Sequence, residues 1–159
     1  MFKKLFFYIL VASISSNSFA QLNLINSPNN SDFIPQNRTT RSAKITLIGE
    51  VTQTWFNKIS IKIFRNNVLI ATHNQGLTFQ SGKAYFNQPI ELKTGKYKYK
   101  ITYQLTGSSS YTYDVKDILI GDVYLIQGQS NAVAASYNAF NIAYYSDYLR
   151  SFGTANRTY

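Results

Sequence analysis

The feature that most constrains the fold is a strict alternation of side-chain type along residues 96–105. Lysine, threonine or glutamine occupies every second position, and the positions between them hold Tyr97, Tyr99, Ile101, Tyr103 and Leu105. Successive side chains of a β-strand point to opposite faces of its sheet. The alternation therefore predicts a strand with one face in a core and the other face in water.

Shorter stretches of the same kind flank this strand and predict a sheet of several strands. Candidate strands cover residues 43–51, 59–64, 68–72, 84–86, 89–92 and 111–115, the fourth and fifth as separate strands of one pair. Asn66-Asn67 predicts a tight hairpin, because asparagine tolerates positive φ, and Thr94-Gly95 and residues 107–110 predict further turns. Short strands with turns between them predict an antiparallel β-sandwich, immunoglobulin-like or jelly-roll-like, over residues 21–117, with an irregular lead-in over residues 21–42.

Aromatic residues make up 16% of the chain, so they either bind sugar rings or fill a core. The candidates for a sugar-stacking platform are Trp55, Tyr97, Tyr99 and Tyr103. Tyrosines at a period of two are more often a sheet face that packs into a sandwich, and we favour the core for them. His73 is the single histidine, and we predict a loop residue rather than a ligand or a base.

The composition gives no sign of a metal site, a disulfide framework or a cofactor. The chain has no cysteine, and its histidine has no carboxylate or thiol nearby at metal-ligand spacing. Stability must therefore come from a packed core, and about 100 residues before residue 121 are enough for one domain.

The first twenty residues have the organisation of a signal peptide. Lys3 and Lys4 form a basic start, residues 5–12 are apolar but too few to span a bilayer, and Ser18-Phe19-Ala20 offers small residues to a signal peptidase. We expect residues 1–20 to be removed and the mature chain to start at Gln21, exported to the periplasm or secreted. No cysteine follows the cleavage position, so we expect no membrane anchor.

The charge balance is strongly basic. The chain has 16 basic and 7 acidic residues, and removal of Lys3 and Lys4 leaves 14 and 7, a net charge of about +7. A basic, tyrosine-rich protein suggests nucleic acid binding, but the basic residues form no compact cluster in the sequence. We therefore expect a solvated face, attracted to anionic surface polymers, and no nucleic acid partner.

A strand-to-helix corner follows in residues 121–131, Gly-Asp-Val-Tyr-Leu-Ile-Gln-Gly-Gln-Ser-Asn. The apolar run 123–126 predicts a buried strand, and the alanine-rich stretch 132–135 predicts the start of a helix. Such a corner presents a serine hydroxyl at the end of a strand, and the free N–H groups of the helix start can receive an oxyanion. The alternative is an ordinary corner whose serine caps a helix.

The block 122–131 resembles the nucleophile block of the SGNH (GDSL-like) hydrolases, in the sialate O-acetylesterase branch. The resemblance implies that Ser130 is the nucleophile and that its own N–H is one donor of the oxyanion hole. It implies that Gly128, Gln129 and Asn131 fix the turn or contact substrate. Residues 27–38 resemble, less closely, the opening of family members that carry an N-terminal β-domain.

The resemblance also implies an α/β, flavodoxin-like hydrolase domain that starts at residue 118. In the family, a glycine donor, an asparagine donor and an Asp-x-x-His block follow the nucleophile, and residues 131–159 contain none of these blocks. Asp147, for example, is followed three positions later by Arg150. We therefore expect residues 118–159 to be the truncated start of that domain, inactive as a fragment.

The function implied by the resemblance is that of an exported serine esterase. It removes acetyl groups from an acetylated glycan or a sialic-acid-type sugar through an acyl-enzyme, without metal or cofactor. The alternative is a non-catalytic β-sandwich module that binds glycans or a cell surface.

Overall fold

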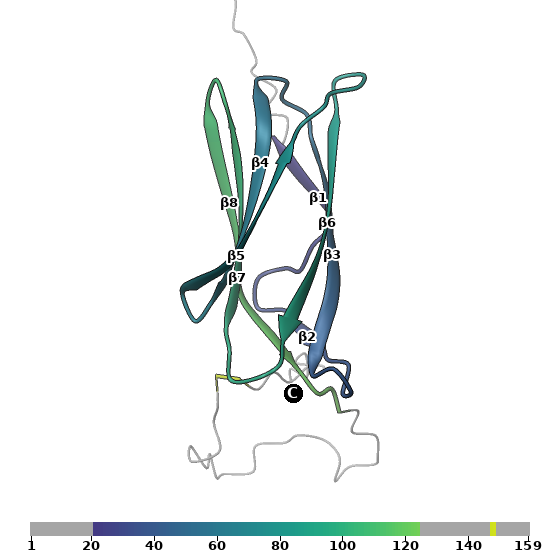
Figure 1. Cartoon of the computed structure of the whole chain (residues 1–159), viewed down its shortest axis with the longest axis vertical. Helices are drawn as coiled ribbons and strands as arrows, with labels where there is room; N and C mark the ends of the chain where they lie inside the picture. The colour runs from purple at the N-terminus through teal and green to yellow at the C-terminus, as the bar shows by residue number, and fades with distance from the viewer. Residues whose placement is uncertain (1–20, 125–146, 149–159) are drawn as a thin grey trace, which may run out of the picture.

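The computed structural model describes residues 21–124 and 147–148, which form an all-β fold of two sheets packed face to face (Figure 1). No helix occurs within these described residues. The strands are β1 (Leu22–Asn26), β2 (Phe33–Pro35), β3 (Ser42–Val51), β4 (Phe56–Arg65), β5 (Val68–Gly76), β6 (Ala84–Lys93), β7 (Tyr99–Gly107) and β8 (Ser110–Gly121). The predicted β-sandwich is confirmed.

One sheet has three strands in the order β1-β3-β6, and the other has five in the order β2-β8-β7-β4-β5. The strand pairs are antiparallel except β2 with β8, which is parallel. Two expectations are thereby corrected: the lead-in 21–42 contains two short strands, and the sandwich is not wholly antiparallel. Strand β2 forms because half-buried Phe33 and Ile34 lie beside Leu119 and Ile120.

The core lies between the sheets and uses the inward positions of the long strands. As the alternation predicted, the inward residues of β7 are buried, and so are Tyr99 and Tyr103 among the aromatic candidates. The ring of Phe86, from the opposite sheet, lies 6.0 Å from that of Tyr103, centroid to centroid. Full burial of a large apolar side chain stabilises a fold by about 1.5–3 kcal/mol, so this interlayer contact helps to hold the sheets together.

Strand β6 is one continuous strand, and the expectation of two separate strands at 84–86 and 89–92 is wrong. All ten residues pair with β3, from Ala84 opposite Val51 to Lys93 opposite Ser42. The alternation continues through Gln88, which is polar although it occupies an inward position. This polar residue made the single strand look like two strands in the sequence. Pro89 is tolerated because β6 is at the edge of its sheet.

The hairpin between β4 and β5 turns at Asn66 and Asn67, as predicted. Both residues have positive φ, 48° and 66°, as the tight hairpin turn requires. Strand β5 continues to Gly76, beyond the expected end at residue 72. His73 therefore lies within a strand, opposite Ile61, and its prediction as a loop residue is wrong.

Strand β8 extends past the expected domain boundary at residue 117 and ends at Gly121. Asp117 has a φ of 60° and lies at a bulge, where the register with β7 shifts. Beyond the bulge, Ile118, Leu119 and Ile120 are all buried. The sandwich thus includes the residues that lead directly into the serine-containing block.

Candidate functional site

The described part of the candidate site is the place where the chain leaves the sandwich. Gly121 ends β8, and the description continues through Asp122 to Tyr124. Gly128, Gln129, Ser130 and Asn131 lie outside the described residues. The structure therefore shows which contacts hold residues 121–124, the entrance to the serine block.

Strand β2 pairs with the end of β8 and so contacts the entrance from one side. Pro35 lies opposite Gly121, and the next N–H, that of Gln36, donates to the Gly121 carbonyl at 2.8 Å. The ring of Phe33 covers Gly121 so closely that an added Cβ would lie 2.8 Å from a ring carbon. A larger residue at this position would have to displace the half-buried Phe33 ring.

Asp122, the first residue of the resemblance block, is held by the loop that follows β2. Arg38 Nε donates to Asp122 Oδ1 at 2.8 Å, and the pair is largely exposed. Hydrogen bonds from the side chains of Gln36 and Arg38 lower the pKa of Asp122. The same carboxylate raises the pKa of Arg38. The two side chains thus fix the carboxylate in its charged form.

Asp147 and Tyr148 lie against the same end of the sandwich. Lys98 Nζ is 2.9 Å from Asp147 Oδ2 and 6.0 Å from the centre of the Tyr148 ring. The hydrogen bond to Asp147 raises the pKa of Lys98. Residues 147–148 therefore contact the sandwich near the start of β7, where Figure 1 shows them in yellow.

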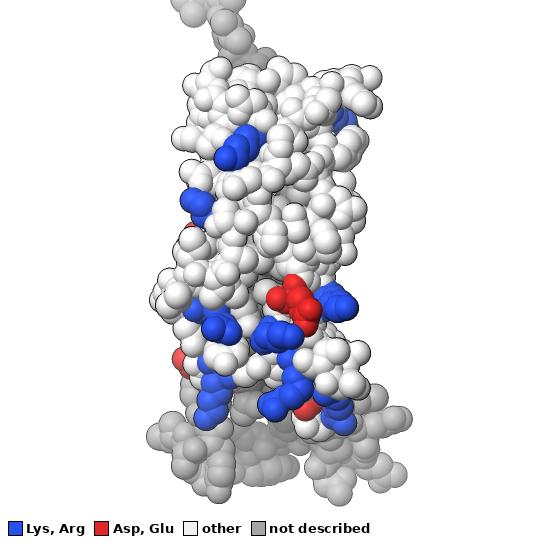
Figure 2. All heavy atoms as spheres, viewed as in Figure 1, with Lys and Arg blue, Asp and Glu red and all other residues white. Residues whose placement is uncertain are grey.

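Basic side chains gather at this end of the molecule. Figure 2 shows most of the visible lysine and arginine over the lower half of the face, where Figure 1 places the end of β8. The strand bounds place eight of them here: Arg38, Arg41, Lys44, Arg65, Lys93, Lys96, Lys98 and Lys100. Strand pairing thus brings basic segments that are separate in the sequence to one end, where Arg38, Lys93 and Lys98 pair with carboxylates.

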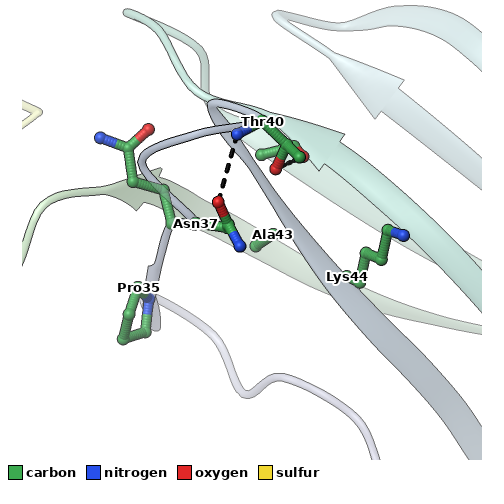
Figure 3. Close-up of a pocket in the computed structure, with 7 residues that line it drawn as sticks. Pro35, Asn37, Thr40, Ala43 and Lys44 are labelled. Carbon is green, nitrogen blue, oxygen red and sulfur yellow. Dashed lines mark hydrogen bonds between the residues drawn. The ribbon is translucent and has the colours of Figure 1, made fainter.

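A pocket of about 350 Å³ lies beside the entrance (Figure 3). Asn37 Oδ1 accepts the N–H groups of Thr39 and Thr40, at 2.9 and 3.2 Å, and shapes the loop that borders it. Gln36 also lines the pocket, and its buried Oε1 has no hydrogen-bond partner among the described residues. The lining offers amide, hydroxyl and lysine groups and no histidine or carboxylate, which suits binding rather than catalysis.

His73 lies far from the entrance. Its strand, β5, is at one edge of the five-stranded sheet, and β2 is at the other. Three strand spacings separate β5 from β8, which corresponds to roughly 14 Å. The fold therefore does not bring His73 to the end of β8.

The aromatic candidates separate into two groups. Tyr99 and Tyr103 are core residues, as favoured, whereas Tyr97 is partly buried and Trp55 is 47% exposed. The sequence reasoning did not single out Tyr111 and Tyr113, which line a second cavity beside β1. The sequence predicted a strand over residues 111–115, but nothing in it showed that this face of the strand is uncovered.

Within residues 21–124 and 147–148, no group of three or more potential ligand side chains is placed to bind a metal ion. The same residues contain no helix with the length and apolar character needed to cross a membrane. Neither a scan of protein-family models nor a search of curated proteins finds a match for this chain.

Proposed function

We propose that this chain forms the N-terminal part of an exported carbohydrate esterase of the sialate O-acetylesterase type, with Ser130 as nucleophile. The observation that supports it is the meeting of the two resembling segments, 27–38 and 122–131. Strand β2 pairs with the end of β8, and Arg38 binds Asp122, 84 residues away. These contacts hold Asp122, the first residue of the proposed nucleophile block, against the sandwich.

In the proposed reaction, Ser130 Oγ attacks the carbonyl carbon of an acetyl ester on a sugar. A general base takes the hydroxyl proton and returns it to the departing sugar oxygen, and water then hydrolyses the acetyl-enzyme. The Ser130 N–H stabilises the oxyanion, while Gly128, Gln129 and Asn131 fix the corner or contact substrate. His73 is not assigned the role of base, because it lies on the opposite edge of the sheet.

The test is covalent labelling of Ser130 in the complete gene product, whatever its length. A fluorophosphonate probe is expected to modify Ser130, and Ser130→Ala is expected to lose labelling and to lower kcat for aryl acetates by about a million-fold. Ser136→Ala, a change six residues later, is the matched control and is expected to keep both the probe labelling and the turnover of aryl acetates. Undiminished turnover in Ser130→Ala would contradict the assignment.

Residues 21–159 alone are expected to show no esterase activity, because a serine hydroxyl needs a neighbouring base. Hydrolysis of an aryl acetate by this chain and by its Ser130→Ala and His73→Ala variants measures this. Activity that both substitutions remove would mean that His73 is the base after all.

The proposed export is tested separately. Intact-mass measurement of the exported protein is expected to find Gln21 at its N-terminus, as the signal-peptide pattern predicts. A retained Met1 would contradict export by this signal.

A further inference from the structure

The two open sides of the sandwich differ. On one side the edge strands β5 and β6 are tied together, since Gln75 Nε2 donates to the Tyr85 carbonyl at 3.0 Å. On the other side lie β1 and the first half of β8, and β2 pairs with β8 only from Leu119 to Gly121. Within the described residues, a cavity of about 300 Å³ lies here between β1 and β8.

This β1–β8 cleft has an apolar wall and a polar rim. Leu22 and Leu24 of β1 lie on one side, Tyr111 and Tyr113 of β8 on the other, and Ser27 and Asn29 at one end. The Ser27 hydroxyl is fixed by a 2.8 Å hydrogen bond to the buried Tyr103 hydroxyl. Tyr113 is 42% exposed, so a ligand can reach its ring.

The lining chemistry selects the class of ligand. Within the described residues, Asn29 bonds to Asp32 through its backbone, and neither its side-chain amide nor the Tyr111 and Tyr113 hydroxyls make a hydrogen bond, so all three can bond to a ligand. The lining contains no charged side chain, which disfavours a charged ligand. The volume is at the small end for ligand sites and suits one ring.

We propose that the β1–β8 cleft binds a neutral pyranose unit of a glycan. The apolar C–H face of the ring lies on Tyr113 and Tyr111, and the sugar hydroxyls bond mainly to Asn29. Ser27 Oγ already donates to the Pro28 carbonyl at 3.1 Å and bonds to the Tyr103 hydroxyl, so it can only accept a bond from the sugar. An extended peptide is a poorer occupant, because β1 has only five residues and an irregular register between Leu24 and Asn26. This site goes beyond the proposed esterase function and does not use Ser130.

The test uses purified residues 21–159 and neutral sugar probes: lactose, N-acetylglucosamine and methyl α-mannoside. In a ¹⁵N NMR titration, at least one probe is expected to shift the amide signals of Asn29, Tyr111 and Tyr113. Tyr113→Ala is expected to weaken that binding about tenfold or more. Asn29→Ala, a change in an exposed loop, tests the same site independently with little risk to folding.

Tyr85→Ala is the matched control, because Tyr85 is 56% exposed but lies outside the cleft. It is expected to bind the sugar as the unchanged protein does. Equal loss in Tyr85→Ala and Tyr113→Ala, or no shift at the cleft with any probe, would overturn the proposal. So would a neutral extended peptide that shifts the β1 amides when no sugar does. Ser130 labelling is expected to be the same in Tyr113→Ala, so the two proposals fail independently.

Discussion

Tyr103 and Tyr113 lie directly opposite each other on neighbouring strands, with their side chains on the same face of one sheet. Tyr103 is 0% exposed and Tyr113 is 42% exposed. Strand β7 is in the middle of the five-stranded sheet, and Phe86 of the other sheet covers Tyr103. Tyr113 instead lines the β1–β8 cleft, where β1 and residues 27–29 lie opposite among the described residues.

The difference shows that alternation determines which face a residue occupies but not whether that face is covered. A five-stranded sheet on a three-stranded sheet leaves inward positions that lack a full set of neighbours. Tyrosine suits both places, since its ring can fill a core while its hydroxyl finds a partner, or can line a wet cleft. The same residue type therefore serves the core at Tyr103 and a candidate binding surface at Tyr113.

The largest expected effect that tests this contrast is on stability. Tyr103→Ala removes a fully buried ring and is expected to cost about 3–5 kcal/mol of unfolding free energy, as large aromatic-to-alanine changes in cores do. Tyr113→Ala is expected to cost about 1 kcal/mol or less, because half-exposed sites have fewer contacts to lose. Urea unfolding of residues 21–159 measures both. Similar losses at the two sites would mean that the β1–β8 cleft is closed in solution.

A smaller effect concerns the titration of Tyr103. Burial raises the pKa of its hydroxyl from 10.0 to about 12, partly offset by the hydrogen bond to Ser27. Because the native state holds the proton more tightly than the unfolded state, this group's contribution to stability is complete below about pH 10. It is lost as the pH rises to about 12.

Ultraviolet titration is expected to show one tyrosine ionising near pH 12 that Tyr103→Phe removes. The variant is also expected to lose stability less steeply over that pH range. An unchanged titration curve in Tyr103→Phe would mean that solvent reaches the Tyr103 hydroxyl.

How far the sequence predicted the fold depended on how regular each strand is. β3, whose alternation is broken only at Ile48, was predicted within one residue of its limits, and β7 was predicted with a shift of two to three residues. The end of β8 was missed because the polar pair Lys116-Asp117 forms a bulge, which breaks the period of two. β2 was missed because three residues are too few to show a period, and its partner is distant in the chain.

The candidate site, like the fold, could be predicted from the sequence only in part. The serine block was visible in the sequence because its residues are contiguous, and its role stays a prediction. The contact between Arg38 and Asp122 was not predictable, because it joins residues 84 positions apart and arises only when β2 pairs with β8. The β1–β8 cleft was hidden for a related reason: its exposure depends on the number of strands in the opposite sheet.

The smallest expected effect concerns the side-chain contacts of Asp122, which lie at the surface, whereas the hydroxyl contact of Tyr103 is buried. Hydrogen bonds from Gln36 and Arg38, together with the charge of Arg38, lower the pKa of Asp122, so Gln36→Ala and Arg38→Gln should each raise that pKa. The stabilisation from these contacts is present above the ordinary carboxyl pKa and is lost as the pH falls through the lowered value. We expect little change in Tm at pH 7, since exposed ion pairs contribute little and salt screens them.

Carboxyl ¹³C NMR titration of Asp122 measures these shifts in the two variants. Lys83→Gln is the matched control, because Lys83 lowers the pKa of Glu50 by the same kind of exposed contact. It is expected to raise the pKa of Glu50 and to leave Asp122 unchanged. If Arg38→Gln and Gln36→Ala also leave Asp122 unchanged, the entrance to the serine block is not held by this contact in solution. The parallel pairing of β2 with β8 would then be its remaining support.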